Sequence, residues 1–283
     1  MRRSVMGLVA FVGVLTFGIG APRAEPLKIR QGWVNLTSIL APLVFEKKDL
    51  MTHYGKTYVV EPMHFASSSA QLTALAAGDL DITVGGPITL AHAIQNAGLN
   101  DIRVIADGFQ DGVDGYFSSR YLVRADSGIK TIEDLKGKIL TSNGLGGTMD
   151  IVIRAAMAQH HMVARRDYTI VEAELAAQNA MLLEGKVNLI SSMPPFAYDP
   201  KIAGKTRVLF TMKQIMGRSQ MTILFARAGF LKKNHDAMTD YFEDAQRGVH
   251  WFLDPANRQA MLDLAARVTK RPRESYARYL YTK

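Results

Sequence analysis

The sequence of 283 residues contains no cysteine, and this absence excludes several kinds of site at once. Without thiols the protein has no disulfide, no zinc–thiolate centre, no cysteine nucleophile and no redox pair. Neither a GxSxG nor an HExxH motif is present, and the seven histidines are scattered. We therefore expect no catalytic residues, no metal and no cofactor.

Long apolar runs are equally scarce, with one exception at the N-terminus. Arg2 and Arg3 precede an uncharged apolar run over residues 5–20, and the small residues Ala21 and Ala24 follow. This pattern is typical of a secretory signal peptide, and the run is shorter than the about 20 residues of a membrane span. We expect residues 1–24 to be a signal peptide and the mature protein to be periplasmic. An N-terminal membrane anchor is the alternative.

The charge balance is basic, with a formal net charge of +8 and a pI of about 9.6. Part of this charge lies in the N-terminal segment and in the C-terminal tail, and no stripe of interleaved arginine and aromatic residues occurs. We therefore expect no nucleic-acid partner. A mean hydropathy of +0.00 and 48% hydrophobic residues indicate an ordinary globular chain, which we expect to be a monomer.

Short apolar strands alternate with helical segments along the mature chain, which predicts an α/β fold with mainly parallel sheets flanked by helices. One early helix is expected over residues 39–54. Longer strands over 116–124 and 219–226 interrupt the alternation and are expected to be hinge strands between two lobes. The predicted lobe I comprises residues 25–117 and 222–283, and lobe II comprises 118–221.

An internal repeat supports the two lobes. An offset of 107 residues aligns Gly78 with Gly185 and Gln71 with Gln178, and it also aligns Asp81 with Asn188. Each copy is a helix, a glycine stop, a strand and a small-residue end followed by proline. The alternative is that any two strand–helix units look alike, but the paired residues at one offset favour a duplication.

Bare backbone ends the first of these repeated strands at Gly85-Gly86-Pro87. Ligands of parallel sheets bind beyond the carboxyl ends of the strands, where helix N-termini point. Glycine there lets a ligand approach the main-chain amides, and proline suits the first helical turn. We expect residues 191–194 to play the same part in lobe II.

Four stretches resemble the solute-binding proteins of ABC importers, nearest to the nitrate/taurine/alkanesulfonate-type family. They are APLVFEKKDL, ALAAGDLDITVGGP, SGIKTIEDLKGK and LLEGKVNLI, within a match over about residues 27–230. The resemblance implies a two-lobed periplasmic-binding fold that closes on a small ligand and docks on a permease with its ATPase subunits. Lys283 ends the chain sooner than the resemblance leads us to expect.

The resemblance also implies where the ligand contacts lie, at the carboxyl ends of strands and near the crossover. The expected contacts are Trp33, Asn35, Thr37, Ser67, Ser68, Ser69, Gly85, Gly86 and Pro87 in the first part of the chain, with Asp114 and Tyr116 near the crossover, and Asn143, Gly146, Thr148, Glu172, Ser191, Ser192 and Met193 in lobe II.

The residue types in this set favour a small organic anion. Helix N-termini and hydroxyl groups suit a sulfonate or carboxylate, and Trp33 and Tyr116 could hold a ring. Glu172, if buried, would instead favour an amine-bearing ligand. Two other functions stay open, namely an enzyme of the same fold acting on a pyrimidine-type molecule and a module that presents its ligand to a sensor receptor.

Overall fold

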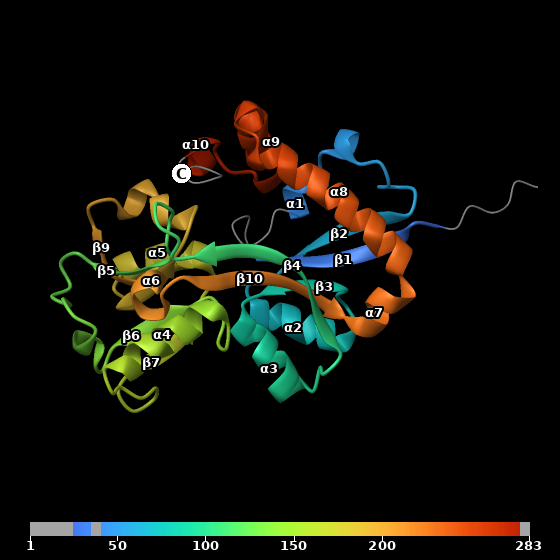
Figure 1. Cartoon of the computed structure of the whole chain (residues 1–283). Helices are drawn as coiled ribbons and strands as arrows, with labels where there is room; N and C mark the ends of the chain where they lie inside the picture. The colour runs from blue at the N-terminus through green and yellow to red at the C-terminus, as the bar shows by residue number, and fades with distance from the viewer. Residues whose placement is uncertain (1–24, 35–40, 278–283) are drawn as a thin grey trace, which may run out of the picture.

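The structure is a computed structural model, which describes residues 25–34 and 41–277 of the chain. Two separate sheets of five strands each are flanked by helices and form two lobes (Figure 1). The predicted two-lobed α/β fold is confirmed. Within the described ranges no helix is long and apolar enough to cross a membrane. The predicted signal peptide over residues 1–24 lies outside the described residues.

The sheet of lobe I has the strand order β2-β1-β3-β10-β4. Strands β1, β2 and β3 are parallel, whereas β10 runs antiparallel to both β3 and β4. Their bounds are Leu27–Trp33 for β1, Tyr58–His64 for β2, Ile82–Gly85 for β3, Ile102–Asp111 for β4 and Ser219–Arg227 for β10. The three parallel strands therefore end at one edge of the sheet, as a ligand site requires.

The sheet of lobe II has the strand order β7-β6-β8-β5-β9. Strand β6 is parallel to β7 and β8, and β5 is antiparallel to β8 and β9. Their bounds are Arg120–Arg124 for β5, Ile139–Ser142 for β6, Thr169–Glu172 for β7, Leu189–Ser192 for β8 and Thr206–Thr211 for β9. Each lobe is thus a mixed sheet with three parallel strands.

Helices cover both sheets. The α-helices are α1 (Ala41–Val44), α2 (Ser68–Ala77), α3 (Pro87–Ala97), α4 (Thr148–Gln159), α5 (Leu175–Leu183), α6 (Met212–Met216), α7 (Ala228–Lys233), α8 (His235–Leu253), α9 (Arg258–Thr269) and α10 (Glu274–Ala277). Five 3-10 turns complete the described part: η1 (Lys48–Leu50), η2 (Glu133–Leu135), η3 (Phe196–Tyr198), η4 (Pro200–Ile202) and η5 (Pro255–Asn257). Lobe I is the larger body because α8 and α9 pack over its sheet, where Tyr241 and Phe252 join the core around Ile29 (Figure 1).

The two copies of the internal repeat form equivalent hydrogen bonds between a buried glutamine and the strand that follows it. Gln71 Oε1 accepts the Val84 N–H at 3.1 Å in lobe I, and Gln178 Oε1 accepts the Ser191 N–H at 3.0 Å in lobe II. Val84 and Ser191 are themselves 107 residues apart. The buried glutamine of each helix therefore fixes the strand that follows it, and the aligned pattern reflects one packing solution used twice.

The predicted helix over residues 39–54 is wrong in its extent. Among the described residues 41–54, only α1 and η1 form, and a loop follows. The buried carboxylate of Asp244 on α8 accepts the backbone N–H groups of Thr52, His53 and Tyr54 at 2.9, 2.9 and 3.0 Å. These three N–H groups donate to the Asp244 carboxylate instead of to carbonyl oxygens one helical turn earlier. The segment therefore forms a loop and not a helix.

The predicted strand over residues 116–124 is also wrong in its first half, because β5 begins only at Arg120. Strand β4 continues instead to Asp111, whose buried carboxylate accepts Ser118 Oγ at 2.5 Å and Ser119 N at 2.8 Å. These bonds, with the positive φ of Gly112 and Gly115, fold residues 112–119 into a loop.

The chain crosses between the two sheets at residues 112–119 and 212–218, while β4 and β10 form a paired ribbon that extends toward lobe II (Figure 1). Phe109 and Met221 of this ribbon pack against the core of lobe II. The predicted lobe boundaries at 117/118 and 221/222 stay predictions.

Candidate ligand-binding site between the lobes

The end of β3 presents main chain to lobe II. Gly85 and Gly86 are buried, Gly86 is the N-cap of α3, and Pro87 opens the helix. A Cβ on Gly86 would lie 2.5 Å from Thr148 Oγ1, so only glycine allows this approach of the two lobes. Behind the strand end, Thr89 is 1% exposed and its hydroxyl has no hydrogen-bond partner within the described residues.

The N-terminus of α2 is the second lobe I element at this place. Ser67 is its N-cap, and the Ser67 hydroxyl accepts the Ala70 N–H at 3.2 Å. Ser68 is half-buried in the first turn. Ser69 Oγ donates to the carbonyl oxygen of Leu145 at 2.8 Å, across to lobe II. One serine thus caps the helix and another joins the lobes.

The loop between β6 and α4, residues 143–147, faces these elements from lobe II. Asn143 Nδ2 donates to the Ala66 carbonyl oxygen at 3.2 Å in lobe I. Gly146 has a φ of 74°, and its N–H donates to Asp150 Oδ2 at 2.8 Å. The Leu145 N–H donates to the carboxylate of Glu172 at the end of β7. Two acidic side chains of lobe II therefore hold the loop in shape.

The lobes meet without intervening space at this loop. A Cβ on Gly144 would lie 2.3 Å from Ser67 Cβ, and a Cβ on Gly146 would lie 3.4 Å from His92 Nδ1 on α3. The contact at Gly144 leaves no room for a Cβ, whereas the separation at Gly146 is an ordinary van der Waals contact. Glycines at 86 and 144 are therefore what lets the lobes come together.

Three helices begin at this junction, α2 at Ser67, α3 at Gly86 and α4 at Gly147. Each helix N-terminus carries a partial positive charge and N–H groups without helical acceptors. Their convergence from both lobes suits an anion. Asp150, in the first turn of α4, is paired with Arg154 at 2.8 Å, and the hydrogen bond to Asp150 raises the pKa of that guanidinium.

Trp33 ends β1 at the same edge of the sheet, next to the end of β2. Its half-buried ring lies 4.5 Å from the ring of His64, centroid to centroid. The Trp33 side chain also packs against the hydrophobic core of lobe I. Asn35 and Thr37, which were expected to follow it, lie outside the described residues.

The remaining expected contacts are placed differently. Asp114 is exposed and forms an ion pair with Lys213, which lowers the pKa of the Asp114 carboxyl. Tyr116 is 53% exposed in the crossover loop. The Ser191 hydroxyl donates inward to Gln178 Oε1 at 3.0 Å, and Met193 is buried in the core of lobe II. The structure does not bring these four side chains to the junction of Gly86 with Thr148.

Ser192 and the chain after it depart from the expected symmetry. Ser192 is fully buried, and its hydroxyl has no partner within the described residues. Pro194 is followed by a cis bond to Pro195 and by the 3-10 turn η3. The expectation that residues 191–194 end like residues 85–87 is therefore wrong in one respect, because no α-helix begins there.

Several groups at the junction were missed by sequence reasoning. They include His92, Asp150 and the carbonyl oxygens of Ala66 and Leu145. Asp150 had a usable signal, since an acid in the first turn after a glycine-rich loop often accepts that loop's amides. The carbonyl contacts had no signal, because any residue type can supply them.

An open cavity of about 360 Å³ lies elsewhere on lobe II. It is lined by Arg124, Ala125, Asp126, Leu183, Gly204 and Lys205. Arg120, not Arg124, pairs with Ser192 at the carboxyl end of β8, so this cavity lies at the opposite edge of the sheet. This cavity is therefore not the place where the N-termini of α2, α3 and α4 meet.

Two five-stranded mixed sheets joined by two crossings, with helix N-termini facing each other, define a two-lobed solute-binding fold. A family model described as the NMT1-like family matches residues 22–266. The chain belongs to this family. A search of curated proteins found no match.

Solved structures share the fold over most of the chain. The alkanesulfonate-binding protein SsuA from Xanthomonas axonopodis pv. citri, bound to MOPS, matches with a TM-score of 0.72 and 18% identity, covering 91% of this chain and 84% of that one. The periplasmic aliphatic sulphonate binding protein SsuA from Escherichia coli matches at 0.68 and 21%, covering 90% and 83%. The periplasmic nitrate-binding protein NrtA from Synechocystis PCC 6803 matches at 0.69 and 17%, covering 89% and 69%. All three of these structural neighbours are described as binding proteins.

Proposed function

We propose that the protein is the extracytoplasmic solute-binding component of an ABC importer. It captures a small organic anion, a sulfonate or an aromatic carboxylate, between its lobes and delivers it to a permease and its ATPase subunits. The mature protein acts in the periplasm as a monomer and catalyses no reaction. The observation that carries the proposal is the convergence of the N-termini of α2, α3 and α4 where the lobes touch.

The chemistry of this junction supports an oxyanion group. The main-chain amides at the start of each helix donate to the anion, and the buried hydroxyls of Thr89 and Ser192 are further donors that lack partners in the described residues. The ring of Trp33 covers the apolar part of the ligand. Micromolar affinity corresponds to about 8 kcal/mol, which a few charge-assisted hydrogen bonds and one ring contact supply.

Lobe closure follows from the two crossings. The ligand first meets one lobe, and bending at residues 112–119 and 212–218 brings the second lobe onto it. The contacts of Ser69 with Leu145 and of Asn143 with Ala66 form only when the lobes meet, so they add to the stability of the closed form. The ligand shifts an existing equilibrium between open and closed forms, and the permease reads the closed shape.

Two measurements test this proposal. Native mass spectrometry of the natively purified chain identifies any co-purified ligand. A thermal-shift panel of alkanesulfonates, aromatic carboxylates, pyrimidines and amines then ranks the ligand classes. We expect an anion to raise the melting temperature and to reduce the radius of gyration in X-ray scattering. Stabilisation by amines alone contradicts the anion, stabilisation without compaction contradicts closure, and turnover of a pyrimidine contradicts a pure binding role.

A further inference from the structure

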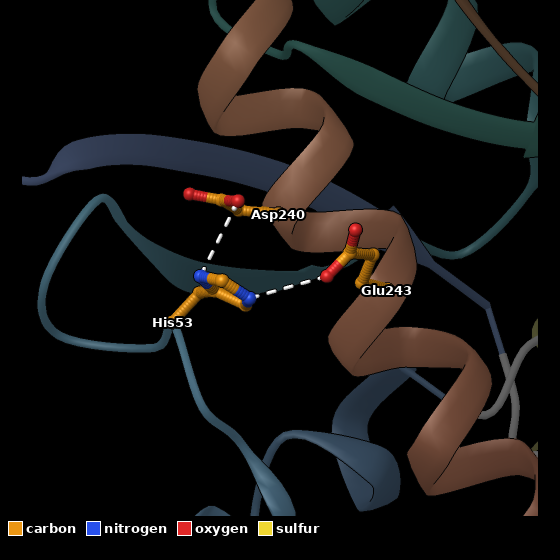
Figure 2. Close-up of side chains that lie close together, drawn as sticks. All are labelled: His53, Asp240 and Glu243. Atoms are coloured by element: carbon orange, nitrogen blue, oxygen red, sulfur yellow. Dashed lines mark hydrogen bonds and ion pairs between the residues drawn. The ribbon is translucent and has the colours of Figure 1, made fainter.

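A second cluster of polar side chains lies away from the lobe junction, on the outer helix of lobe I. His53 sits between two carboxylates of α8, Asp240 and Glu243 (Figure 2). His53 Nδ1 is 3.3 Å from Asp240 Oδ1, and His53 Nε2 is 3.2 Å from Glu243 Oε2. One ligand atom from each of the three residues can be chosen so that all lie within 4.8 Å of one another.

We propose that His53, Asp240 and Glu243 form a binding site for a divalent transition-metal ion of the zinc class. One imidazole nitrogen and two carboxylate oxygens are ligands of the kind that zinc accepts, with water in the remaining position. An imidazole ligand favours zinc-class ions over magnesium and calcium, which prefer oxygen alone. This site is independent of the anion site between the lobes.

The geometry needs little rearrangement. Ligand atoms that share a tetrahedral zinc ion lie about 3.4 Å apart, given zinc–ligand distances of about 2.0–2.1 Å. The distance from His53 Nε2 to Glu243 Oε2 already matches this separation. Asp240 Oδ1 faces the other ring nitrogen, Nδ1, at 3.3 Å, so the Asp240 carboxylate has to turn toward Nε2 to share the ion.

The frame around the cluster is rigid, which favours a defined site. The His53 N–H donates to Asp244 Oδ2 at 2.9 Å, and Asp244 is fully buried. The same carboxylate accepts Tyr58 Oη at 2.9 Å. The main chain of His53 is therefore held opposite the helical turn that carries Asp240 and Glu243. Ligands fixed in this way lose little entropy on binding a metal.

The charges of the cluster suit a dication. Asp240 and Glu243 supply two carboxylates, and a metal ion binds the imidazole of His53 through a nitrogen that carries no proton. The third acid, Asp244, is matched by Arg247, whose Nη1 lies 2.5 Å from Asp244 Oδ1. Arg247 Nη2 also lies 3.5 Å from Glu243 Oε2, so the ion competes with a partly exposed cation there. The side chain of Glu243 is 51% exposed, which gives the ion a route from solvent.

Zinc chloride titrated into the metal-stripped full chain tests the site by calorimetry. We expect saturable binding of one zinc ion and a rise in melting temperature, because the ion joins segments about 190 residues apart. His53→Gln and Glu243→Gln should each weaken zinc binding at least tenfold. Asp240→Asn is a milder third variant, should His53→Gln fail to fold by circular dichroism.

The matched control is His160→Gln. His160 Nδ1 lies 2.6 Å from Glu133 Oε1 on the surface of lobe II, but no third ligand completes a group there within the described residues. This variant should keep the wild-type zinc affinity and the zinc-induced rise in melting temperature. Wild-type protein that binds no zinc, or folded His53→Gln and Asp240→Asn variants with unchanged affinity, would overturn the proposal.

Discussion

Lobe I and lobe II hold their central strands by the same bonds but with different charges. Asp81 in lobe I exchanges two bonds with the main chain of Arg30, at 2.8 and 2.9 Å. Asn188 in lobe II does the same with Ile139, at 3.1 and 2.7 Å. Only Asp81 also pairs with a guanidinium, that of Arg30. The duplicated unit therefore requires a side-chain acceptor at this place but no charge.

The lobes also differ beyond the strand ends. In lobe I the chain after Gly86 enters the helix α3, whereas in lobe II the chain after Met193 enters the short turn η3. Two of the three helix N-termini at the junction consequently come from lobe I. Lobe I alone also carries the long helix α8, which covers its sheet. The two lobes therefore share the repeated helix–strand unit, and they differ in the segments that follow it.

The largest effect is expected from Asp244→Asn. Asp244 lies on α8, which lobe II lacks, and it attaches the loop of residues 52–54 to that helix. Asp244 accepts three backbone N–H groups and the Tyr58 hydroxyl. Losing this buried charged acceptor should cost about 3 kcal/mol of unfolding free energy in urea titrations at pH 7. Asp236→Asn, on an exposed position of the same helix, is the control and should change little.

The same carboxylate predicts an acid dependence. Burial raises the pKa of Asp244, but the backbone hydrogen bonds from Thr52 and His53 outweigh it, so the pKa falls below its ordinary value of 3.8. A lowered pKa in the folded state gives stability above the unfolded value, and this stability is lost as the pH falls through the folded value. Wild type should therefore approach Asp244→Asn in stability below pH 3.8. A constant difference down to pH 2 would contradict this role.

A smaller effect is expected at the repeated glutamines. Gln71→Met and Gln178→Met each leave a strand N–H and a hydroxyl unpaired in the core, and Gln71→Met should cost about 1–2 kcal/mol. Gln178→Met should cost about 1 kcal/mol more, because Gln178 Nε2 also donates to the Ala173 carbonyl oxygen at 2.8 Å. Gln71 Nε2 has no such partner within the described residues. Urea titrations test the order, with Gln95→Met on an exposed position as control, and the reverse order would break the comparison.

Contact between the lobes is tested by Gly144→Ala. The new Cβ would meet Ser67 across the junction, so it opposes closure rather than folding. Overpacking of about 1–3 kcal/mol should lower the affinity for the anion found in the ligand panel roughly ten- to hundredfold. The melting temperature without ligand should stay within about 2 °C of wild type. Gly229→Ala, where a Cβ meets open space, is the control, and equal losses of affinity in both variants would contradict the role of Gly144.

The smallest effect is expected from Asp81→Asn, which gives lobe I the acceptor of lobe II. The bond from the Arg30 N–H is retained, and the partly exposed ion pair with the Arg30 guanidinium is lost. We expect a loss of about 1 kcal/mol in urea titrations. Asn188→Asp provides the opposite exchange and should also cost no more than about 1 kcal/mol. A loss several times larger in Asp81→Asn would show that the charge in lobe I is essential.

Much of the fold could be predicted because local signals agree with it. The glycine stops at Gly78 and Gly98 both have the positive φ of a helix C-terminus, and Ser67 is the N-cap expected of it. The end of strand β3 at Gly85 was likewise predictable, because glycines and a proline follow a short apolar run. The helix expected over residues 39–54 failed because a carboxylate nearly 200 residues away captures its backbone, and no local pattern records such an acceptor.

The residues of the candidate site also fall into those that local sequence signals predicted and those that depend on distant contacts. Strand ends and helix starts placed Ser69, Gly86, Asn143 and Thr148 at the junction, since the carboxyl ends of parallel strands meet at one edge. Asp114 and Tyr116 were expected to reach the ligand from the crossover, but Tyr116 is exposed and Asp114 pairs with Lys213. The grouping of His53 with Asp240 and Glu243 was invisible, because about 190 residues separate them in sequence.

The sequence by itself determined the alternating α/β order, the duplicated unit and the glycines at the strand ends, because each is encoded by residues that are neighbours along the chain. Long-range packing set which glycine faces which side chain across the lobes, where the chain crosses between the sheets, and which loop donates its backbone N–H groups to Asp244. The contacts of such packing join residues that have no local relation to one another.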